Sequence, residues 1–461
     1  MKKTATNGIL WIFAIGQLGW SILSGIIANW MVFFYQPSQE ELAKGQLEFL
    51  PKGTILGLTA IGLITAFGRI FDAVTDPLIA GRSDSLKHKL GRRIPFMRFS
   101  ALPFGAVTIL LFCSPFEAGS KGNIVSLFVC AVLFYFCMTC YCTPYNALIP
   151  ELGRTQEARI NLSTFISVTY FFGTAIAYLV PNIAGIFASS AGYAGSYRIT
   201  IAILAVVAVV CMLVPSFLID ENTYADTTPS QSTAFKSLLS TFRNKDFRLF
   251  VASDILYWVG LTLFQTGLSY YVTVLLGLDS KNTFPLFAVM TATSLVFYPA
   301  VNVFSKKMGK KKLIAFAFIF FSFTFLVTAL AGLTGLPPMI HGIIIAVLAA
   351  VPMAILGILP QAVVADISEA DKIETGESRQ GMFYAARTFA FKMGQSAAML
   401  LFTSISLINS DVPKGSSGYG LGYRMTAVIA AVLCLAGGIV FLRYNENKIL
   451  SKIQTASKED E

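Results

Sequence analysis

Residues 68–77 read Gly-Arg-Ile-Phe-Asp-Ala-Val-Thr-Asp-Pro, and they place Arg69, Asp72 and Asp76 inside a long apolar run. On a helix the two aspartates share one face, and Arg69 lies about one turn before Asp72. Each charge within a membrane-spanning helix costs at least about 2.5–3.5 kcal/mol. If this run spans a membrane, its charged side chains must therefore face a polar cavity.

The composition indicates that the run does span a membrane. Of the 461 residues, 55% are hydrophobic and 13% are charged, whereas a soluble domain usually carries about 25% charged residues. The seven cysteines all lie within apolar runs, so no disulfide framework is expected. The acidic residues do not pair with a His or Ser nucleophile, and the sequence therefore does not indicate an enzyme.

The apolar runs predict an all-α membrane protein. A bilayer core about 30 Å thick requires roughly 20 apolar residues for each helix. Twelve transmembrane helices are expected, at residues 9–35, 53–80, 95–115, 123–149, 160–188, 197–219, 247–276, 283–305, 313–333, 339–366, 381–407 and 422–443. They would form an N-terminal six-helix bundle at 1–219 and a C-terminal one at 247–443, with a cytoplasmic linker at 220–246 and a cytoplasmic tail at 444–461.

The placement of positive charge predicts the orientation. The net charge is +10, and most lysines and arginines lie in alternate loops, in the linker and in the tail. Because cytoplasmic loops carry the excess of Lys and Arg, we expect both termini in the cytoplasm and a multi-pass protein of the bacterial inner membrane. This topology explains the basic charge, so no nucleic-acid partner is expected.

The two halves of the chain resemble each other. Residues 144–151 read Pro-Tyr-Asn-Ala-Leu-Ile-Pro-Glu, and residues 360–366 read Pro-Gln-Ala-Val-Val-Ala-Asp at the matching place in the second half. The second and eighth helices each lead into a basic loop, Gly-Arg-Arg at 91–93 and Gly-Lys-Lys at 309–311. A pseudo-symmetric repeat of six helices is typical of transporters that bind their substrate near mid-membrane.

The aspartate pair predicts a cation site. Two nearby carboxylates repel, so either one takes up a proton or a cation binds between them. The hydroxyl groups of Thr75 and Thr139 would complete an oxygen shell with Asp72 and Asp76. Such a shell suits Na⁺, whereas a proton-binding carboxylate suits H⁺, and the sequence leaves both open. In the alternative interpretation, Arg69 neutralises one aspartate and the group only joins two helices.

Lys392 is a second ionisable residue deep in an apolar run, within Phe-Ala-Phe-Lys-Met-Gly at 389–394. A lysine so far from a helix end is expected to point inward, toward the aspartates or a substrate oxygen; a structural ion pair is the alternative. Asp254 lies nearer a helix end, so it either lines a cavity with Trp258 or has a surface or gating role. Gln17 and Trp20 are polar or amphipathic residues of the first helix.

The charged loop at 81–93 predicts a gate. Its residues would form salt bridges with neighbouring helix ends, and these would break when the transporter changes its facing; the alternative is charge that only directs topology. The gating candidates are Arg69, Arg82, Asp84, Arg92, Arg93 and Asp366.

The motif at 69–81, Arg-Ile-Phe-Asp-Ala-Val-Thr-Asp-Pro-Leu-Ile-Ala-Gly, resembles the glycoside–pentoside–hexuronide:cation symporters of the major facilitator superfamily. Further similarities are Gly-Arg-Arg at 91–93, the stretch at 144–151, and Lys-Met-Gly at 392–394, so the resemblance covers most of the chain. It implies alternating access, and the cation ligands of that family would map to Asp72, Thr75, Asp76 and Thr139. The family's mid-membrane lysine would map to Lys392.

The sugar-binding positions depart from that family's pattern. Two aspartates, a tryptophan and an arginine of the pattern are replaced here by Leu18, Cys142, Asn146 and Phe165. The resemblance therefore implies intact cation coupling with altered substrate recognition. The substrate-binding or coupling candidates are Lys392, Gln17, Trp20, Cys142, Asn146, Arg387, Asp254 and Trp258.

The function expected from these features is cation-coupled symport of a sugar or glycoside. One alternative is transport of a lysolipid or other amphiphile on the same fold, because the clan also includes sodium-dependent lysolipid carriers. A membrane sensor or scaffold that transports nothing is another. No cofactor is expected beyond the coupling ion, Na⁺ or H⁺, and no other metal. A monomer in contact with membrane lipids is expected.

Overall fold

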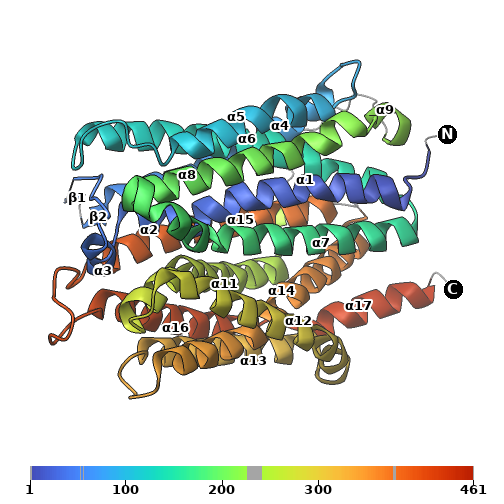
Figure 1. The fold of residues 1–461 in the computed structure, drawn as a ribbon. Coiled ribbons are helices and arrows are strands. Elements are labelled where there is room, and N and C mark those ends of the chain that lie inside the picture. The colour runs from blue at the N-terminus through green and yellow to red at the C-terminus, as the bar shows by residue number, and fades with distance from the viewer. Residues whose placement is uncertain (1–2, 52, 56, 226–240, 377–379, 460–461) are drawn as a thin grey trace. The chain divides into compact units, whose positions relative to one another are not determined.

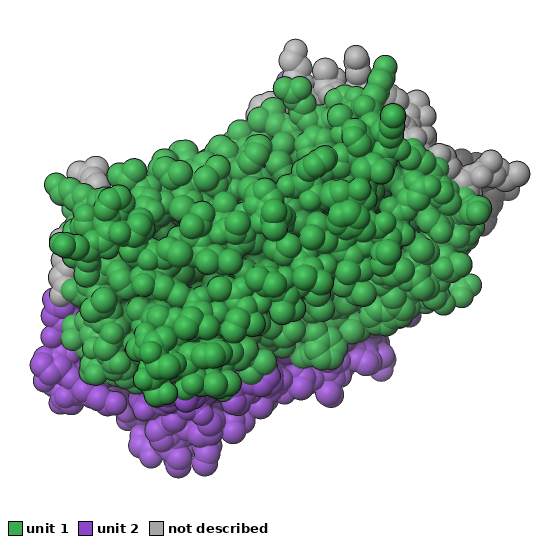
Figure 2. Space-filling view, turned by 45° about the horizontal axis from the view of Figure 1, so that its top comes forward, with its two compact units in different colours: residues 1–232 green, residues 233–461 purple. Residues whose placement is uncertain are grey.

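The computed structural model describes residues 3–51, 53–55, 57–225, 241–376 and 380–459. The chain divides into two compact units, residues 1–232 and 233–461, coloured separately in Figure 2. Both units are built of long helices, which Figure 1 traces from the N-terminus to the C-terminus. Part of the expected linker, 226–240, lies outside the described residues.

The first unit contains six long helices and several short elements. Their bounds are α1 (Asn7–Ile26), a π-helix (Ile27–Met31), α2 (Val32–Tyr35), α3 (Gln39–Ala43), β1 (Thr54–Ile55), β2 (Leu58–Thr59), α4 (Ala60–Ser85), α5 (Ile94–Leu110), α6 (Lys121–Leu152), α7 (Gln156–Tyr178), α8 (Val180–Leu218) and α9 (Glu221–Tyr224). The two short strands pair in an antiparallel hairpin ahead of α4.

The second unit also contains six long helices. Its elements are α11 (Lys245–Tyr270), a π-helix (Tyr271–Leu275), a 3₁₀ turn (Ser280–Asn282), α12 (Thr283–Met308), α13 (Lys310–Ala329), α14 (Pro338–Thr375), α15 (Gln380–Ile405), α16 (Leu421–Phe441) and α17 (Glu446–Glu459). Within the described residues this makes twelve long helices, and the expected all-α fold of two six-helix bundles is confirmed.

The membrane-spanning character of these helices follows from their length and apolarity. Eight segments of the described chain qualify on those grounds, and one of the eight covers α7 and α8 together. α5 is apolar but has only 17 residues. α4 and α15 are absent from that set, and they are the helices that carry Arg69, Asp72, Asp76, Arg387 and Lys392.

The helices of the two units pack in the same order. In the first unit α1 packs on α7 and α8, α6 packs on α4 and α5, and α5 also contacts α8. In the second unit α11 packs on α15 and α16, α14 packs on α12 and α13, and α13 also contacts α16. The first helix of each unit also ends in a π-helical turn. The resemblance between the halves therefore extends from short motifs to the whole packing scheme.

α4 differs from its expected bounds. The sequence predicted a helix over 53–80, but the chain first forms the β1–β2 hairpin, and α4 continues to Ser85. Thr59 begins the helix because its side-chain oxygen accepts a hydrogen bond from Gly62 N. Asp72 thus lies near the middle of α4, roughly 20 Å from its C-terminal end at 1.5 Å per residue.

The break between the fifth and sixth spans lies at Gly192, where φ is +68° and the helical conformation is interrupted. A kink precedes it at the junction of α7 and α8, because Pro181 has no N–H to donate to the carbonyl of Ala177. Trp30 Nε1 donates to that carbonyl instead, at 2.7 Å. The indole of Trp30 therefore ties the π-helical turn after α1 to the kink between α7 and α8.

Each bundle is followed by a short segment that caps the bundle's third helix. Glu221 Oε2 accepts from the backbone N–H groups of Arg93 and Ile94 at 2.8 and 2.9 Å, at the start of α5. Glu446 accepts from Lys310 N and Lys311 N at 2.8 and 3.0 Å, at the start of α13. A carboxylate at a helix N-terminus satisfies unpaired donors and interacts favourably with the helix dipole.

The caps are a further internal repeat. Residues 220–222 read Asp-Glu-Asn and residues 445–447 read Asn-Glu-Asn. Each carboxylate occupies space beside a glycine with positive φ, Gly91 at +101° and Gly309 at +84°. A Cβ on Gly91 would lie 2.3 Å from Glu221 Oε2, so only glycine admits the cap there.

Replacing Glu221 with alanine is expected to destabilise the protein by about 2–6 kcal/mol, because two backbone N–H groups lose a buried acceptor at about 1–3 kcal/mol each. The measurement is the thermal unfolding of purified protein in detergent. Glu117→Ala, at an exposed position of the same unit, serves as the control and should leave the Tm unchanged. A Glu221→Ala protein as stable as the control variant would contradict the capping role.

Candidate cation and substrate site

The aspartates of α4 are held by hydroxyl groups of α6. Thr139 Oγ1 donates to Asp72 Oδ1 at 2.8 Å, and Thr143 Oγ1 donates to Asp76 Oδ1 at 3.1 Å. Thr75 Oγ1 lies 3.3 Å from Thr139 Oγ1. The predicted ligands Asp72, Thr75 and Thr139 therefore meet in one unit, and Thr143 joins Asp76 one turn further along both helices.

This arrangement is an in-register ladder between two helices. Asp72 and Thr139 are 67 residues apart in the chain, and so are Asp76 and Thr143. One turn along α4 thus corresponds to one turn along α6, as expected for parallel neighbouring helices. Close approach near the ladder depends on Gly68, because a Cβ there would lie 2.3 Å from the ring of Tyr135 on α6.

The two rungs of the ladder differ in exposure. Asp72 is 0% exposed and Thr139 is 1% exposed. Asp76 and Thr143 are only half-buried. A buried carboxylate needs compensating donors or a cation, and all four side chains present oxygen, which is the ligand type that hard cations take. The ladder is therefore chemically suited to a small cation.

Arg69 does not neutralise the aspartates by an ion pair within the described part of the chain. Its guanidinium group lies over the ring of Tyr135, with Cζ 5.3 Å from the ring centroid. A cation–π contact of this kind stabilises the positive charge of the guanidinium group without an ion pair to a carboxylate. The interpretation in which Arg69 pairs with an aspartate and only joins two helices is therefore not supported by the geometry.

The second unit contains a buried ion pair that the sequence did not predict. Arg387 Nε and Nη2, on α15, donate to the two carboxylate oxygens of Asp254, on α11, at 2.8 and 3.0 Å. The side chains are 6% and 4% exposed, so a surface role for Asp254 is wrong. Next to the pair, Trp258 stacks on Phe391 with ring centroids 4.5 Å apart. This two-point pair fixes α11 against α15.

The remaining substrate candidates lie in both units. Lys392 is on α15, five residues after Arg387, and is 9% exposed. In the first unit, Gln17 is buried, and Trp20 lies 6.4 Å from Tyr170 between ring centroids. Cys142 is half-buried and Asn146 is exposed on α6. The placement of these side chains within each unit does not test their predicted substrate contacts, which stay predictions.

One residue at an altered sugar position has a clear partner. Phe165 stacks on Trp11 with ring centroids 4.1 Å apart and an interplanar angle of 17°. The arginine of the resembled pattern is thus replaced by half of an aromatic pair. This change makes the local surface more apolar.

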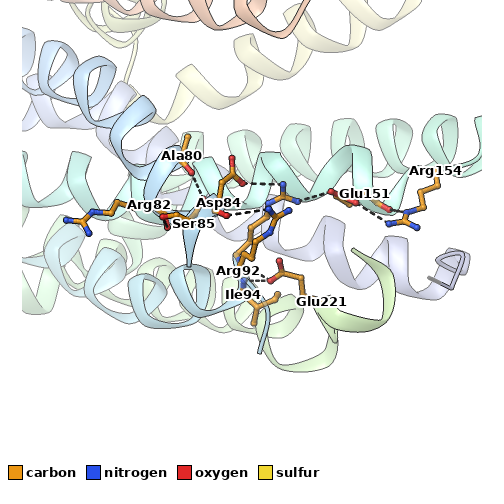
Figure 3. Close-up of polar contacts among 11 residues, drawn as sticks. Ala80, Arg82, Asp84, Ser85, Arg92, Ile94, Glu151, Arg154 and Glu221 are labelled. Atoms are coloured by element: carbon orange, nitrogen blue, oxygen red, sulfur yellow. Dashed lines mark hydrogen bonds and ion pairs between the residues drawn. The ribbon is translucent and has the colours of Figure 1, made fainter. Parts of the chain in front are cut away.

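The predicted gating loop forms a chain of salt bridges in the first unit. Arg93 lies 3.5 Å from Asp84 and 3.6 Å from Glu151, which in turn pairs with Arg154 at 3.2 Å (Figure 3). Arg92 Nη1 donates to the carbonyl of Asp84 at 3.4 Å. The network joins the end of α4, the start of α5 and the end of α6.

Three gating candidates, Arg82, Arg69 and Asp366, lie outside this network. Arg82 is exposed on the last turn of α4, where its carbonyl accepts from Ser85 Oγ. Arg69 lies more than three turns earlier on the same helix. In the second unit, Asp366 pairs with Lys310 at the start of α13. Arg93 and Lys310 thus make corresponding contacts in the two bundles, each with an acid on the fourth helix of its bundle.

Three functional features were missed from the sequence. Thr143 had a detectable signal, because it follows Thr139 by four residues just as Asp76 follows Asp72. The repeat of Glu-Asn at 221–222 and 446–447 was also visible. The Asp254–Arg387 pair had no local signal, because its residues are 133 positions apart.

The comparison with known families gives a match over nearly the whole chain. The family described as "MFS/sugar transport protein" matches residues 12–448. The chain belongs to this family. It is therefore a multi-pass membrane transporter for small molecules, and not an enzyme.

Several proteins similar in sequence to this chain are named as symporters. The uncharacterized symporter YnaJ of Bacillus subtilis is 24% identical over 396 residues, covering 83% of this chain and 79% of the relative. The putative glycoside/cation symporter YagG of Escherichia coli is 28% identical over 207 residues, 43% of each chain. The sodium-dependent lysophosphatidylcholine symporter 1 of Xenopus tropicalis is 22% identical over 432 residues, covering 84% of this chain and 80% of the relative.

Solved structures support the fold of the family member. The nucleoside transporter NupG aligns with a TM-score of 0.62 over 95% of this chain and 99% of its own, at 11% sequence identity. At that identity the likeness shows the fold alone. The major facilitator fold that was expected from the sequence is confirmed.

Proposed function

We propose that this transporter is a cation-coupled symporter of a sugar or glycoside. The single observation that carries the coupling is the ladder of Asp72, Asp76 and two threonines within the first unit. A cation bound there offsets the electrostatic repulsion between the two nearby carboxylates. It thereby favours either the outward-facing or the inward-facing state of the transporter. The family description and the glycoside/cation name of YagG support the substrate class.

The coupling ion is proposed to be Na⁺ or H⁺. Thr139 donates to Asp72 and Thr143 donates to Asp76, so each carboxylate is oriented by a hydroxyl group. A hydroxyl that donates its proton to a carboxylate still has lone pairs for a metal cation. This arrangement favours Na⁺ over H⁺. Lys392 and the Asp254–Arg387 pair are proposed to act in substrate binding or coupling from α11 and α15.

A second candidate substrate is a lysolipid or other amphiphile. The sodium-dependent lysophosphatidylcholine symporter matches 84% of this chain. At the altered sugar positions, Leu18, Cys142 and Phe165 replace charged residues of the resembled pattern, and the Trp11–Phe165 stack adds apolar surface there. These substitutions favour a substrate with an apolar part.

The cellular setting is proposed from charge placement. The excess of Lys and Arg in alternate loops supports a bacterial inner-membrane location with both termini in the cytoplasm. The proposed working form is a monomer, in contact with membrane lipids.

The test is uptake into proteoliposomes that contain the purified protein. Labelled sugars and glycosides are offered in one panel and lysophosphatidylcholine in another, with an inward Na⁺ gradient, an inward proton gradient or no gradient. Uptake of a glycoside above empty vesicles, stimulated by one gradient, supports the proposal. Uptake of lysolipid alone selects the second candidate. Gradient-independent flux of every compound contradicts cation coupling.

A further inference from the structure

We infer that Thr143 is a positioning residue of the cation site, which orients the carboxylate of Asp76 toward a bound metal cation. This inference rests on the proposed cation coupling. It goes beyond the ligand set expected from the sequence, which comprised Asp72, Thr75, Asp76 and Thr139. The observation behind it is the 3.1 Å hydrogen bond from Thr143 Oγ1 to Asp76 Oδ1.

The geometry makes Thr143 equivalent to Thr139. Both threonines lie on α6, four residues apart, and each donates to an aspartate that lies 67 residues before it on α4. Many other threonines of the long helices donate to a backbone carbonyl of their own helix, as Thr108 does to Phe104 O at 2.8 Å. Thr139 and Thr143 instead direct their hydroxyl protons across to a carboxylate.

The second rung also differs from the first in its neighbouring prolines. Asp76 and Thr143 are each followed directly by a proline, Pro77 on α4 and Pro144 on α6. Because proline has no N–H, the carbonyls of Ala73 and Cys140 lack their usual helical donor. Two backbone oxygens are thereby released on the turn between the rungs, and hard cations accept carbonyl ligands.

Exposure distinguishes the roles of the two rungs. The Asp72–Thr139 rung is fully buried, whereas Asp76 and Thr143 are half-buried. The hydroxyl of Thr143 donates to the half-buried carboxylate of Asp76 at 3.1 Å, and this hydrogen bond restricts the orientations that the carboxylate can adopt.

The test is a Na⁺ titration of the purified full-length protein in detergent at pH 7.5, with choline chloride holding the ionic strength constant. Half-saturating Na⁺ is read from the rise in Tm and from tryptophan fluorescence. Thr143→Val is expected to raise it about tenfold or more, because a hydrogen bond to a charged group is lost. Thr143→Ser, which keeps the hydroxyl, is expected to restore it to within about twofold of the unsubstituted protein.

Thr108→Val is the matched control, because it removes a buried threonine hydroxyl of the same unit that donates only to its own helix. In the absence of Na⁺, the Thr143→Val and Thr143→Ser proteins should have the same Tm. If the hydroxyl of Thr143 were only structural, the Tm of the Thr143→Val protein would be the lower of the two. If the Thr143→Val titration matches that of the unsubstituted protein while Thr139→Val is impaired, the inference is wrong and the coupling proposal stands. If neither the unsubstituted protein nor any variant responds to Na⁺, the inference about Thr143 and the proposal of Na⁺ coupling are both wrong.

Discussion

A protein in which Asp72 is replaced by asparagine is expected to fold but to lose cation-stimulated transport. Asp72 is wholly enclosed and accepts from Thr139 at 2.8 Å. Asparagine keeps the shape and an acceptor oxygen, so the helix contact survives, while the charge that would bind the cation is removed. Removing a charge from the interior of a membrane helix also removes its insertion cost, so stability should not fall.

The Asp72→Asn replacement is expected to lower the affinity for the cation strongly. A carboxylate about 4 Å from a monovalent cation contributes about 4 kcal/mol at an effective dielectric constant of about 20. Even if half of that is offset by desolvation, half-saturating Na⁺ rises by at least about 30-fold. The measurement is Na⁺-dependent uptake into proteoliposomes together with the Na⁺-dependent rise in Tm.

Asp76→Asn should be impaired in the same assays, because its carboxylate forms the second rung of the ladder with Thr143. Thr108→Val supplies a control for the loss of a buried polar group in the same unit. Unchanged Na⁺ stimulation in the Asp72→Asn protein, at normal folding, would rule out a cation site on α4.

Removing one partner of the buried pair in the second unit is expected to destabilise the protein strongly. Arg387→Met leaves the carboxylate of Asp254 buried after the loss of two hydrogen bonds, at 2.8 and 3.0 Å. Breaking a buried ion pair in this way costs about 3–5 kcal/mol. The measurement is thermal unfolding of the detergent-solubilised protein.

A double replacement separates the pair's own contribution from the cost of a buried charge. Asp254→Leu combined with Arg387→Met removes both charges, and most of the lost stability should return. Lys372→Met is the matched control, because it breaks the exposed pair with Glu369 in the same unit and should cost no more than about 1 kcal/mol. A double variant as unstable as Arg387→Met would show that packing, and not the unpaired charge, causes the loss.

The double variant also tests function. If it folds but transports nothing, the pair acts in the transport cycle as well as in stability. If it transports normally, the pair only joins α11 to α15, and the predicted substrate role of Asp254 and Arg387 is wrong.

Much of the fold was predictable from the sequence because the signals are local. A run of about 20 apolar residues must be a helix in a bilayer, whichever neighbours it meets. The proline motifs at 144–151 and 360–366 likewise predicted the repeat of the halves, which the packing order of the helices confirmed. The end of α4 was placed five residues too early, since Arg82 and Asp84 continue the helix although their charges were interpreted as a loop.

The candidate cation ligands were also predictable. A charged side chain in an apolar helix has a large insertion cost, so such residues indicate a functional site. Spacing along one helix, as in Asp72 and Asp76, places side chains on one face without any knowledge of tertiary contacts. The sequence by itself thus determined that this chain is a bundle of membrane helices with an acidic face on the second one.

Only the tertiary structure decided which groups meet those side chains. The register of α4 on α6 depends on how closely the backbones approach, and Gly68 against Tyr135 sets that distance. One residue of slip would remove Thr139 and Thr143 from the aspartates. The same holds for Arg387 with Asp254 and for Glu221 with the start of α5, since contacts between distant segments follow from packing and not from the periodicity of either helix.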